Sequence, residues 1–203
     1  MGVSERKLRD QEKIKQQIID QSWLIVQEEG WHSLSIRKIA DAIEYSIPVI
    51  YKHFENKDAI VEYFTKIGFA LLADQLALTV KQNKPADQQL NNLAVSYWNF
   101  AFENKKYYEI MFGLGIPKCE VVNSVKEMKA ASDVMMNCIA RCMEEHQIDN
   151  SNLYLKLKTF WSILHGIIAI ELISNQETNP EEVSPILKDA IQGFIISLKY
   201  KQN

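Results

Sequence analysis

The sequence predicts an all-helical protein, with three helices in a small N-terminal domain and a larger C-terminal helical bundle, about nine helices in total. Apolar residues recur three and four positions apart along most of the chain, which is the spacing of one face of a helix. No segment alternates apolar and polar residues as a half-buried strand would. Only 7 glycines and 5 prolines occur in 203 residues, and no internal repeat interrupts the helical pattern.

Length and composition fit an intracellular protein of one large or two small domains, which we expect at residues 1–56 and 57–203. The charged start MGVSERKLRDQEK has no apolar export signal, and we find no apolar run long enough to span a membrane. Three cysteines indicate reduced thiols, so we expect a cytoplasmic protein without a membrane partner. The net charge of −3 argues against a broadly basic nucleic-acid binder but allows a small basic footprint.

The first predicted helix covers Ser4–Glu29 and ends at Gly30, the residue that a left-handed helix end favours. Its inner stripe contains Ile18 and Ile25. Basic residues slightly outnumber acidic ones in its first turns. They indicate either a solvated helix face or an N-terminal arm that contacts phosphate.

Two short helices are expected to follow, joined by a turn at Glu44-Tyr45. Ser35 is a good N-cap for the first, Ile36–Ile43, because its hydroxyl can accept an amide of the first turn. Ser46 is the expected N-cap of the second, and Pro48 fits its first turn.

The second short helix is the candidate DNA-recognition helix. Ile50 and Phe54 are four residues apart and should face the core, which leaves a mixed apolar, aromatic and basic face outside. A DNA major groove explains such a face, because recognition helices reach base edges there. We expect Tyr51, His53 and Lys57 to contact phosphate, although Lys57 could instead pair with Glu55. The full DNA-binding set is Ser35, Ser46, Ile47, Pro48, Val49, Tyr51, Lys52, His53 and Lys57, with Ile47, Val49 and Lys52 facing the bases.

The run IRKIADAIEYSIPVIYKHFENKDAI resembles the DNA-binding signature of TetR/AcrR-type transcriptional regulators. The resemblance rests on Ile39-Ala40, on the Tyr51-Lys52-His53-Phe54 ending, on Lys57 and on the upstream Gly30-Trp31 pair. Glu44 and Pro48 stand where the family usually has glycine, and a non-glycine residue at the turn predicts backbone strain. The resemblance implies operator DNA as a partner and a helix-turn-helix domain.

Five further helical segments are expected in the C-terminal part. They are Asn56 to about Gln82, Asp87–Asn104 with a continuation through Phe112, Ser124 to about His146, Leu153–Ile173, and Pro180–Lys199. An irregular connection at residues 113–117 and a polar loop after Ile173 separate them.

A second resemblance covers Tyr97–Phe112 and the Trp161…His165-Gly166 segment, which are similar to a C-terminal domain of some of these regulators that carries a Trp…His-Gly (WHG) signature. Lys105 departs from that pattern, where proline is usual. The resemblance implies a small-molecule effector site. Its candidate lining is aromatic and methionine-rich, which suits an apolar or aromatic ligand, although each residue could equally be bundle core: Trp98, Phe102, Tyr108, Met111, Phe112, Met136, Trp161 and His165.

The last two helices carry more apolar residues than one bundle face needs, which predicts a homodimer with a four-helix interface. The residues expected in that interface are Phe160, Ile163, Ile167, Ile170, Ile191, Phe194, Ile195 and Leu198.

Cys138, Cys142 and His146 recur every four residues and share one helix face. They span about 12 Å along the helix, too far for one ion to reach all three, so no metal site or cofactor is expected. No phosphate loop, HExxH or serine-elbow motif occurs, so we expect no enzymatic activity.

Together these features favour a one-component DNA-binding transcriptional regulator, most simply a repressor that a small effector releases from its operator. The alternative is a helical binding or scaffold protein that has lost DNA binding, which the acidic balance and Glu44 would suit.

Overall fold

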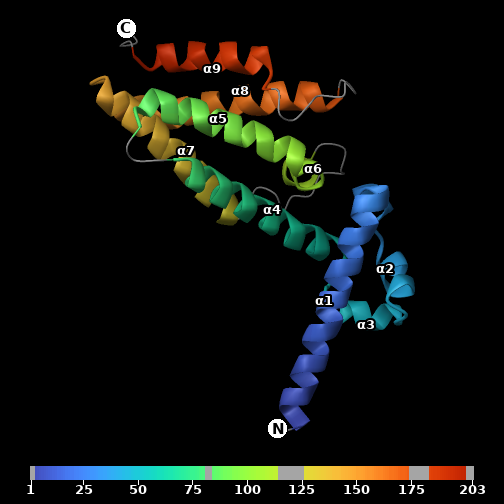
Figure 1. Ribbon diagram of the computed structural model, residues 1–203. Helices are drawn as coiled ribbons and strands as arrows, with labels where there is room; N and C mark the ends of the chain where they lie inside the picture. Colours follow the sequence, from blue (N-terminus) through green and yellow to red (C-terminus); the bar gives the residue numbers. More distant parts are fainter. Residues whose placement is uncertain (1–2, 81–83, 114–125, 174–182, 200–203) are drawn as a thin grey trace. The chain divides into compact units, whose positions relative to one another are not determined.

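The computed structural model describes residues 3–80, 84–113, 126–173 and 183–199, and every regular element within them is helical (Figure 1). This confirms the all-α prediction. The nine α-helices of the described residues are α1 (Val3–Glu29), α2 (Ile36–Ala42), α3 (Ile47–Tyr51), α4 (Lys57–Thr79), α5 (Ala86–Glu103), α6 (Lys105–Phe112), α7 (Lys126–Glu145), α8 (Leu153–Ile173) and α9 (Pro185–Ser197). Two short 3₁₀ helices, η1 (Trp31–Ser33) and η3 (Asn150–Asn152), precede α2 and α8.

The chain forms two compact units. Unit 1 comprises Met1–Thr65 and Glu109–Asn123, and unit 2 comprises Lys66–Tyr108 and Ser124–Asn203. Helices α4 and α6 therefore each contribute residues to both units.

Unit 1 is built on the inner stripe of α1. Ile18 and Val26 of this stripe are fully buried. Ser22 between them is also buried, and its hydroxyl donates a hydrogen bond to the Ile18 carbonyl at 2.6 Å. Trp23 stacks on Phe64 at the start of α4, with 5.3 Å between ring centroids, and Trp31 meets the same ring edge-on at 5.6 Å. These ring contacts hold α1 and η1 against the first turns of α4, and they stabilise the packing by more than the burial of apolar surface alone.

Gly30 separates α1 from η1 with a φ of 84°, a conformation that a side chain would disfavour. Its amide still donates to the Val26 carbonyl at 2.9 Å, which closes the last turn of α1. The expected helix end at this glycine is confirmed.

Unit 2 is a bundle in which α5, α7, α8 and α9 pack on one another, with α9 alongside α8 (Figure 1). Large side chains fill its centre: Tyr97, Trp98, Phe100 and Phe160 are all fully buried. Phe160 of α8 packs on Phe194 of α9, with ring centroids 5.1 Å apart. The bounds of α8 agree with the predicted helix, because its apolar period runs unbroken from Leu153 to Ile173.

Some predicted helix ends were wrong. The last helix does not reach back toward Pro180 without interruption: Val183 and Ser184 are non-helical, and α9 starts at Pro185. The Ser184 hydroxyl caps it by accepting from the Ile186 amide at 3.3 Å, and the helix ends at Ser197. Pro180 and Pro185 both fit the first position of a helix, so the preference for proline at that position could not decide which of them starts α9.

Two other helices also end earlier than expected, α2 at Ala42 and α4 at Thr79. The α5–α6 break is a single residue, Asn104, whose carbonyl accepts from the Tyr108 amide at 2.9 Å. The predicted irregular connection beyond Gly113, the helix start at Ser124, the loop after Ile173 and Pro180 itself lie outside the described residues.

One segment, Asn150–Ile173, is long and apolar enough to cross a membrane by length and composition, contrary to the expectation from sequence. Core helices of soluble proteins meet the same criterion. Helix α8 packs on α5, α7 and α9 through buried residues such as Leu164 and Ile168, which is the environment of a bundle helix.

Candidate nucleic-acid interface and effector region

The first helix of the motif is capped as predicted. The Ser35 hydroxyl accepts a hydrogen bond from the Lys38 amide at 3.2 Å, and the Lys38 ammonium pairs with Glu29 at the end of α1. This ion pair lowers the pKa of the exposed Glu29 carboxyl, mainly through the hydrogen bond from Lys38. The cap and the ion pair fix the start of α2 against α1.

The predicted cap of the second helix was wrong in its chemistry. Ser46 occupies the N-cap position of α3, but its side chain accepts no backbone hydrogen bond. An N-cap hydroxyl normally accepts from the second or third helical amide. Pro48 is the second residue and has no N–H, and the third amide, of Val49, donates instead to the Ser46 carbonyl at 2.9 Å.

The turn between α2 and α3 places Glu44 in the left-handed region, with a φ of 59°. The turn is closed by hydrogen bonds from the Tyr45 amide to the Ala40 carbonyl at 3.0 Å and from the Glu44 amide to Asp41 at 3.3 Å. The turn is therefore formed without glycine, and Glu44 adopts the left-handed conformation from which strain is expected in a non-glycine residue.

Helix α3 is anchored by Ile50 within it and by Phe54, which lies just beyond its end at Tyr51. Ile50 is 0% exposed and Phe54 is 7% exposed, and the Phe54 ring meets Tyr63 of α4 edge-on at 6.1 Å. The predicted inward pair is confirmed. The remaining residues of the candidate set are exposed or half-buried, with Ile47 39% and Tyr51 52% exposed. Four other members of the set are also exposed: Ser35, Ser46, Pro48 and Lys52. The remaining three are half-buried: Val49, His53 and Lys57.

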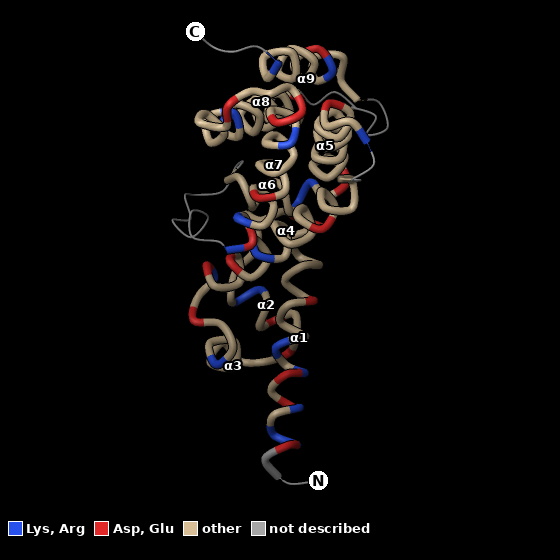
Figure 2. The backbone as a smooth tube through the Cα atoms, turned by 90° about the vertical axis from the view of Figure 1, so that its left-hand side faces the viewer, with Lys and Arg blue, Asp and Glu red and all other residues tan. Residues whose placement is uncertain are grey.

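Positive charge gathers around His53. Its own burial lowers the pKa of the imidazole, and the charges of Lys15 on α1 and Lys52 add to this, while Glu12 opposes them. Both signs of charge alternate along the first half of α1 (Figure 2). The α1 lysine whose charge lowers the pKa of His53 is Lys15. His53 is therefore neutral at pH 7 and can donate an N–H to phosphate.

Lys57 opens α4 directly after its cap, since the Asn56 carboxamide oxygen accepts from the Ala59 amide at 2.8 Å. Within the part of the chain that the structure describes, Lys57 forms no ion pair, with Glu55 or any other residue. A cation at a helix N-terminus is unfavourable to the helix dipole, so its position needs another explanation.

An open, polar hollow of about 280 Å³ lies beside the turn. It is lined by Gln17, Asp20 and Gln21 of α1 and by residues 42–44, which include the Glu44 carboxylate. Two carboxylates disfavour a DNA phosphate in this hollow.

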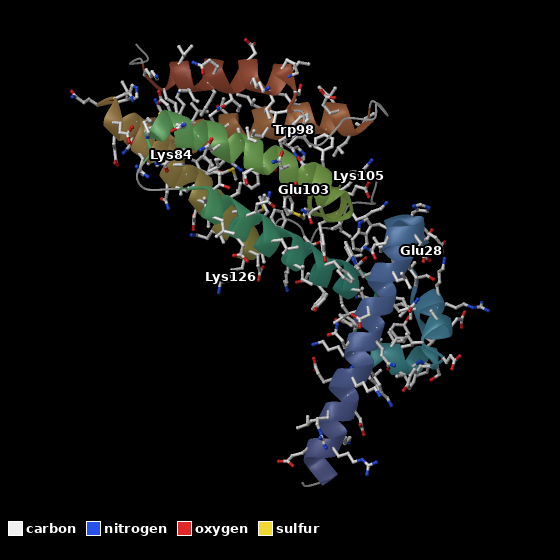
Figure 3. The ribbon with its side chains drawn as sticks, in the orientation of Figure 1. Glu28, Lys84, Trp98, Glu103, Lys105 and Lys126 are labelled. Atoms are coloured by element: carbon white, nitrogen blue, oxygen red, sulfur yellow. The ribbon has the colours of Figure 1, made fainter. Side chains whose placement is uncertain are left out.

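In unit 2, Trp98 of α5 (labelled in Figure 3) is fully buried and packs on Phe102, with ring centroids 4.5 Å apart. Its indole N–H finds no acceptor among the described residues. A buried donor without an acceptor costs about 1–3 kcal/mol, so this group is unusual in a bundle core.

Four side chains form a buried polar chain across α5, α6 and α8. The Trp161 indole donates to the Tyr97 hydroxyl at 2.8 Å, and the Tyr108 hydroxyl bonds to His165 Nδ1 at 2.7 Å. Burial raises the pKa of both tyrosines far above the usual value and lowers the pKa of His165. The structure thus brings together three predicted effector residues, Tyr108, Trp161 and His165. The fourth residue of the chain, Tyr97, was not among the residues predicted from the sequence. A buried tyrosine hydroxyl needs a partner, but its identity depends on helices far apart in sequence.

The other effector candidates are less closely connected. Met136 on α7 is half-buried in unit 2, whereas Met111 is buried and Phe112 half-buried in the segment that belongs to unit 1.

Most residues predicted for a dimer interface belong to the protomer's own core. Phe160, Ile191, Phe194, Ile195 and Leu198 are buried within unit 2, and Ile163 and Ile167 are half-buried. Only Ile170, which is 70% exposed, is open to solvent. The sequence showed an apolar surplus on these helices but not which stripe remains outside.

Apart from Ile170, the exposed stripe consists of other residues of the same helices. On α8 it comprises Leu155, Thr159, Ser162, Gly166, Ile170 and Ile173, spaced three and four apart, with the exposed Lys158 beside its first turns. On α9, Ile186 and Ile196 are 64% and 44% exposed, with the exposed Gly193 between them. A Cβ atom at Gly166 or Gly193 would meet nothing within 4 Å.

Cys138 and Cys142 of α7 are both buried, and His146 directly follows the end of α7. The structure adds Asp87 of α5 to Cys142 and His146 and leaves Cys138 out of the cluster. Asp87 lies 55 residues before Cys142, so periodicity along one helix could not reveal it.

Comparison with protein families gives two matches. Residues 18–64 match the model described as bacterial regulatory proteins, tetR family, and residues 90–194 match tetracyclin repressor-like, C-terminal domain. The second match alone covers more than half of the 203 residues.

Individual proteins agree with these matches. YobS of Bacillus subtilis, an uncharacterized HTH-type transcriptional regulator, is 25% identical over 187 residues, which are 90% of this chain and 93% of YobS. A structure of unknown function from Rhodococcus sp. RHA1 aligns with a TM-score of 0.72 at 18% identity, over 92% of this chain and 95% of that one. The regulator FadR of Bacillus subtilis, in complex with stearoyl-CoA, aligns with a TM-score of 0.69 at 15% identity, over 89% and 97%. The structural likenesses show a shared fold.

Proposed function

The chain belongs to the TetR family of bacterial regulatory proteins, and we propose that it is a dimeric repressor which a small molecule with an apolar or aromatic part releases from its operator. It is a helix-turn-helix transcriptional regulator. The observation that carries the proposal is the outer face of α3, where Ile47, Tyr51 and Lys52 remain exposed on a helix fastened by Ile50 and Phe54. The cytoplasm, where operator DNA is accessible, is the proposed location.

The proposed DNA contacts divide by chemistry. Ile47, Val49 and Lys52 face base edges, where apolar contact with thymine methyls and donation to guanine distinguish sequences. Tyr51, His53 and Lys57 contact phosphate, which positions the protein without reading sequence. The absence of an ion pair at Lys57 among the described residues and the Lys15 charge near His53 support this division.

The proposed dimer forms through the exposed stripes of α8 and α9. Leu155, Ile170 and Ile173 of the α8 stripe are more than half exposed, and exposed apolar patches of this kind mark interaction sites. Gly166 and Gly193 leave open space beside it, so a second copy's helices can approach closely. A two-fold dimer would supply the pair of recognition helices, about 34 Å apart, that successive major grooves require.

The proposed effector site lies around Trp98, Phe102 and the polar chain that ends at His165. The Trp98 N–H, which has no acceptor among the described residues, would gain one from a ligand, and the surrounding rings suit an apolar body. FadR, which shares the fold, was solved with stearoyl-CoA, which supports an acyl thioester as the first ligand to try. Ligand binding would favour a conformation in which the two recognition helices no longer fit successive grooves.

A gel-shift assay tests both halves of the proposal. The protein should retard a DNA fragment from upstream of its own gene, and it should do so in the presence of excess unrelated DNA. Stearoyl-CoA, with free coenzyme A as the control, should reverse the shift. Retardation that no acyl-CoA reverses would contradict the proposed ligand class, and absence of retardation would favour a scaffold protein that has lost DNA binding.

A further inference from the structure

We propose that Asp87, Cys142 and His146 form a binding site for a divalent transition-metal ion, of the zinc type, between the start of α5 and the end of α7. Each residue offers one ligand atom, and the three atoms all lie within 4.8 Å of one another. Cys142 Sγ is 3.2 Å from Asp87 Oδ1, and His146 Nε2 is 4.0 Å from the same oxygen.

These separations are close to what a tetrahedral ion needs. Metal–ligand bonds of about 2.0–2.3 Å place the ligand atoms of a zinc site about 3.3–3.8 Å apart. The Cys142–Asp87 distance is already that short, and small side-chain rotations would bring His146 in. All three belong to unit 2: Asp87 is on α5, Cys142 is on α7, and His146 directly follows α7. Because α5 and α7 pack closely on each other, the helices need not move.

The imidazole of His146 is oriented for coordination. Its Nδ1 lies 3.0 Å from the Cys142 carbonyl, which can only accept, so Nδ1 carries the proton. In the neutral imidazole Nε2 is then the unprotonated nitrogen, and it is the one that faces Asp87. An imidazole whose other nitrogen donates to a backbone carbonyl is the usual arrangement of a metal-binding histidine.

The donor set selects the class of ion. One thiol, one imidazole and one carboxylate suit Zn²⁺ or Co²⁺, whereas Mg²⁺ and Ca²⁺ prefer oxygen ligands alone. Asp87 and His146 are half-buried, so solvent can supply a fourth ligand. Lys199 pairs with Asp87 Oδ2, which leaves Oδ1 turned toward Cys142 and His146.

Ion binding would displace the proton that the free thiol holds. In the free protein the Cys142 thiol donates a hydrogen bond to Asp87 Oδ1 at 3.2 Å, so the sulfur carries its proton. The S–H bond breaks as the metal–sulfur bond forms, and the proton goes to solvent, with no change of oxidation state. Metal uptake should therefore release a proton and strengthen as pH rises.

Titration of the full-length apo-protein with Co²⁺ tests the site. The host is the Cys119→Ser, Cys138→Ser double variant, which retains Cys142 as its single cysteine. Co²⁺ should produce a near-ultraviolet thiolate charge-transfer band and the intense visible bands of a tetrahedral ion, and Zn²⁺ should abolish both.

Conservative ligand variants locate the site. Adding Cys142→Ser to the host should abolish the charge-transfer band, and adding His146→Gln or Asp87→Asn should weaken Co²⁺ binding about tenfold or more. Circular dichroism of each variant establishes that the helices persist. A host without the charge-transfer band, or affinity unchanged in the His146→Gln and Asp87→Asn variants, would overturn the proposal.

Discussion

Glu44 shows how one residue can preserve a turn at a cost. Its φ of 59° is one that glycine adopts freely and glutamate does not. Glu44→Gly should therefore raise the free energy of unfolding by about 0.5–1 kcal/mol, which thermal or urea denaturation can measure. Glu28→Gly, within α1, is the control and should lower it by about as much. Destabilisation by Glu44→Gly would show that the turn is not strained.

Lys57 and Lys52 should differ in what they do to DNA binding. Lys57→Ala should weaken binding to all sequences and reduce the salt slope by about one unit per protomer, because a phosphate contact releases a counterion. Lys52→Ala should instead change which operator base pairs matter. Fluorescence anisotropy at several salt concentrations, with a panel of single-base operator variants, distinguishes the two. A base-pair-specific effect of Lys57→Ala would refute its assignment.

His53 should make DNA binding dependent on pH. The free protein holds this imidazole neutral, because burial and Lys15 lower its pKa below 6.5. A phosphate would raise that pKa, so the complex takes up a proton and affinity falls as pH rises through the pKa of the complex. The change should be about tenfold for each unit by which DNA raises the pKa. His53→Gln should flatten this profile, and an unchanged profile in the variant would exclude His53 from the phosphate contact.

At the scale of elements, α8 and α9 should hold the dimer together. Ile170→Glu places a charge on the exposed stripe without disturbing the protomer's core, since Ile170 is 70% exposed. It should convert the dimer to monomers at micromolar concentration, as measured by analytical ultracentrifugation, while the circular dichroism of the helices stays unchanged. Leu78→Glu, at an 81% exposed position on α4, is the matched control and should remain dimeric.

Two tryptophans in unit 2 should respond differently to loss of the indole N–H. Trp161→Phe breaks the hydrogen bond to Tyr97, whereas Trp98→Phe removes a donor that has no partner among the described residues. Trp98→Phe should therefore destabilise the protein less, by about 1 kcal/mol. It should also raise the stearoyl-CoA concentration needed for DNA release about five- to tenfold. Equal stability of the two variants and unchanged release would remove Trp98 from the effector site.

Patterns within one helix were read correctly from the sequence. The Ser35 cap, the inward Ile50 and Phe54, and the extent of α8 each depend on residues a few positions apart. Features that depend on contacts between distant helices were not. Asp87 beside Cys142, and Tyr97 beside Trp161, join residues 55 and 64 positions apart, and no spacing rule reaches that far.

We propose that one chain carries both a DNA-reading unit and a sensing unit. Unit 1 keeps the outer face of α3 exposed. Unit 2 buries aromatic and polar side chains, together with a Trp98 donor for which the described part of the chain supplies no acceptor. Membership of the TetR family, with separate matches for the N-terminal and C-terminal parts, supports this division into a DNA-reading unit and a sensing unit. A coupling between effector and operator of about 1–3 kcal/mol is typical of such linked sites.

The most direct test of the central claim is fluorescence anisotropy of a labelled duplex from upstream of the protein's own gene, titrated with purified protein. We predict saturable binding with two protomers per duplex, which excess unrelated DNA does not abolish. The double variant Tyr51→Ala, Lys52→Ala should weaken this binding about tenfold or more. Binding no tighter than to unrelated DNA, or binding that this double variant leaves intact, would contradict the assignment of α3 as the recognition helix.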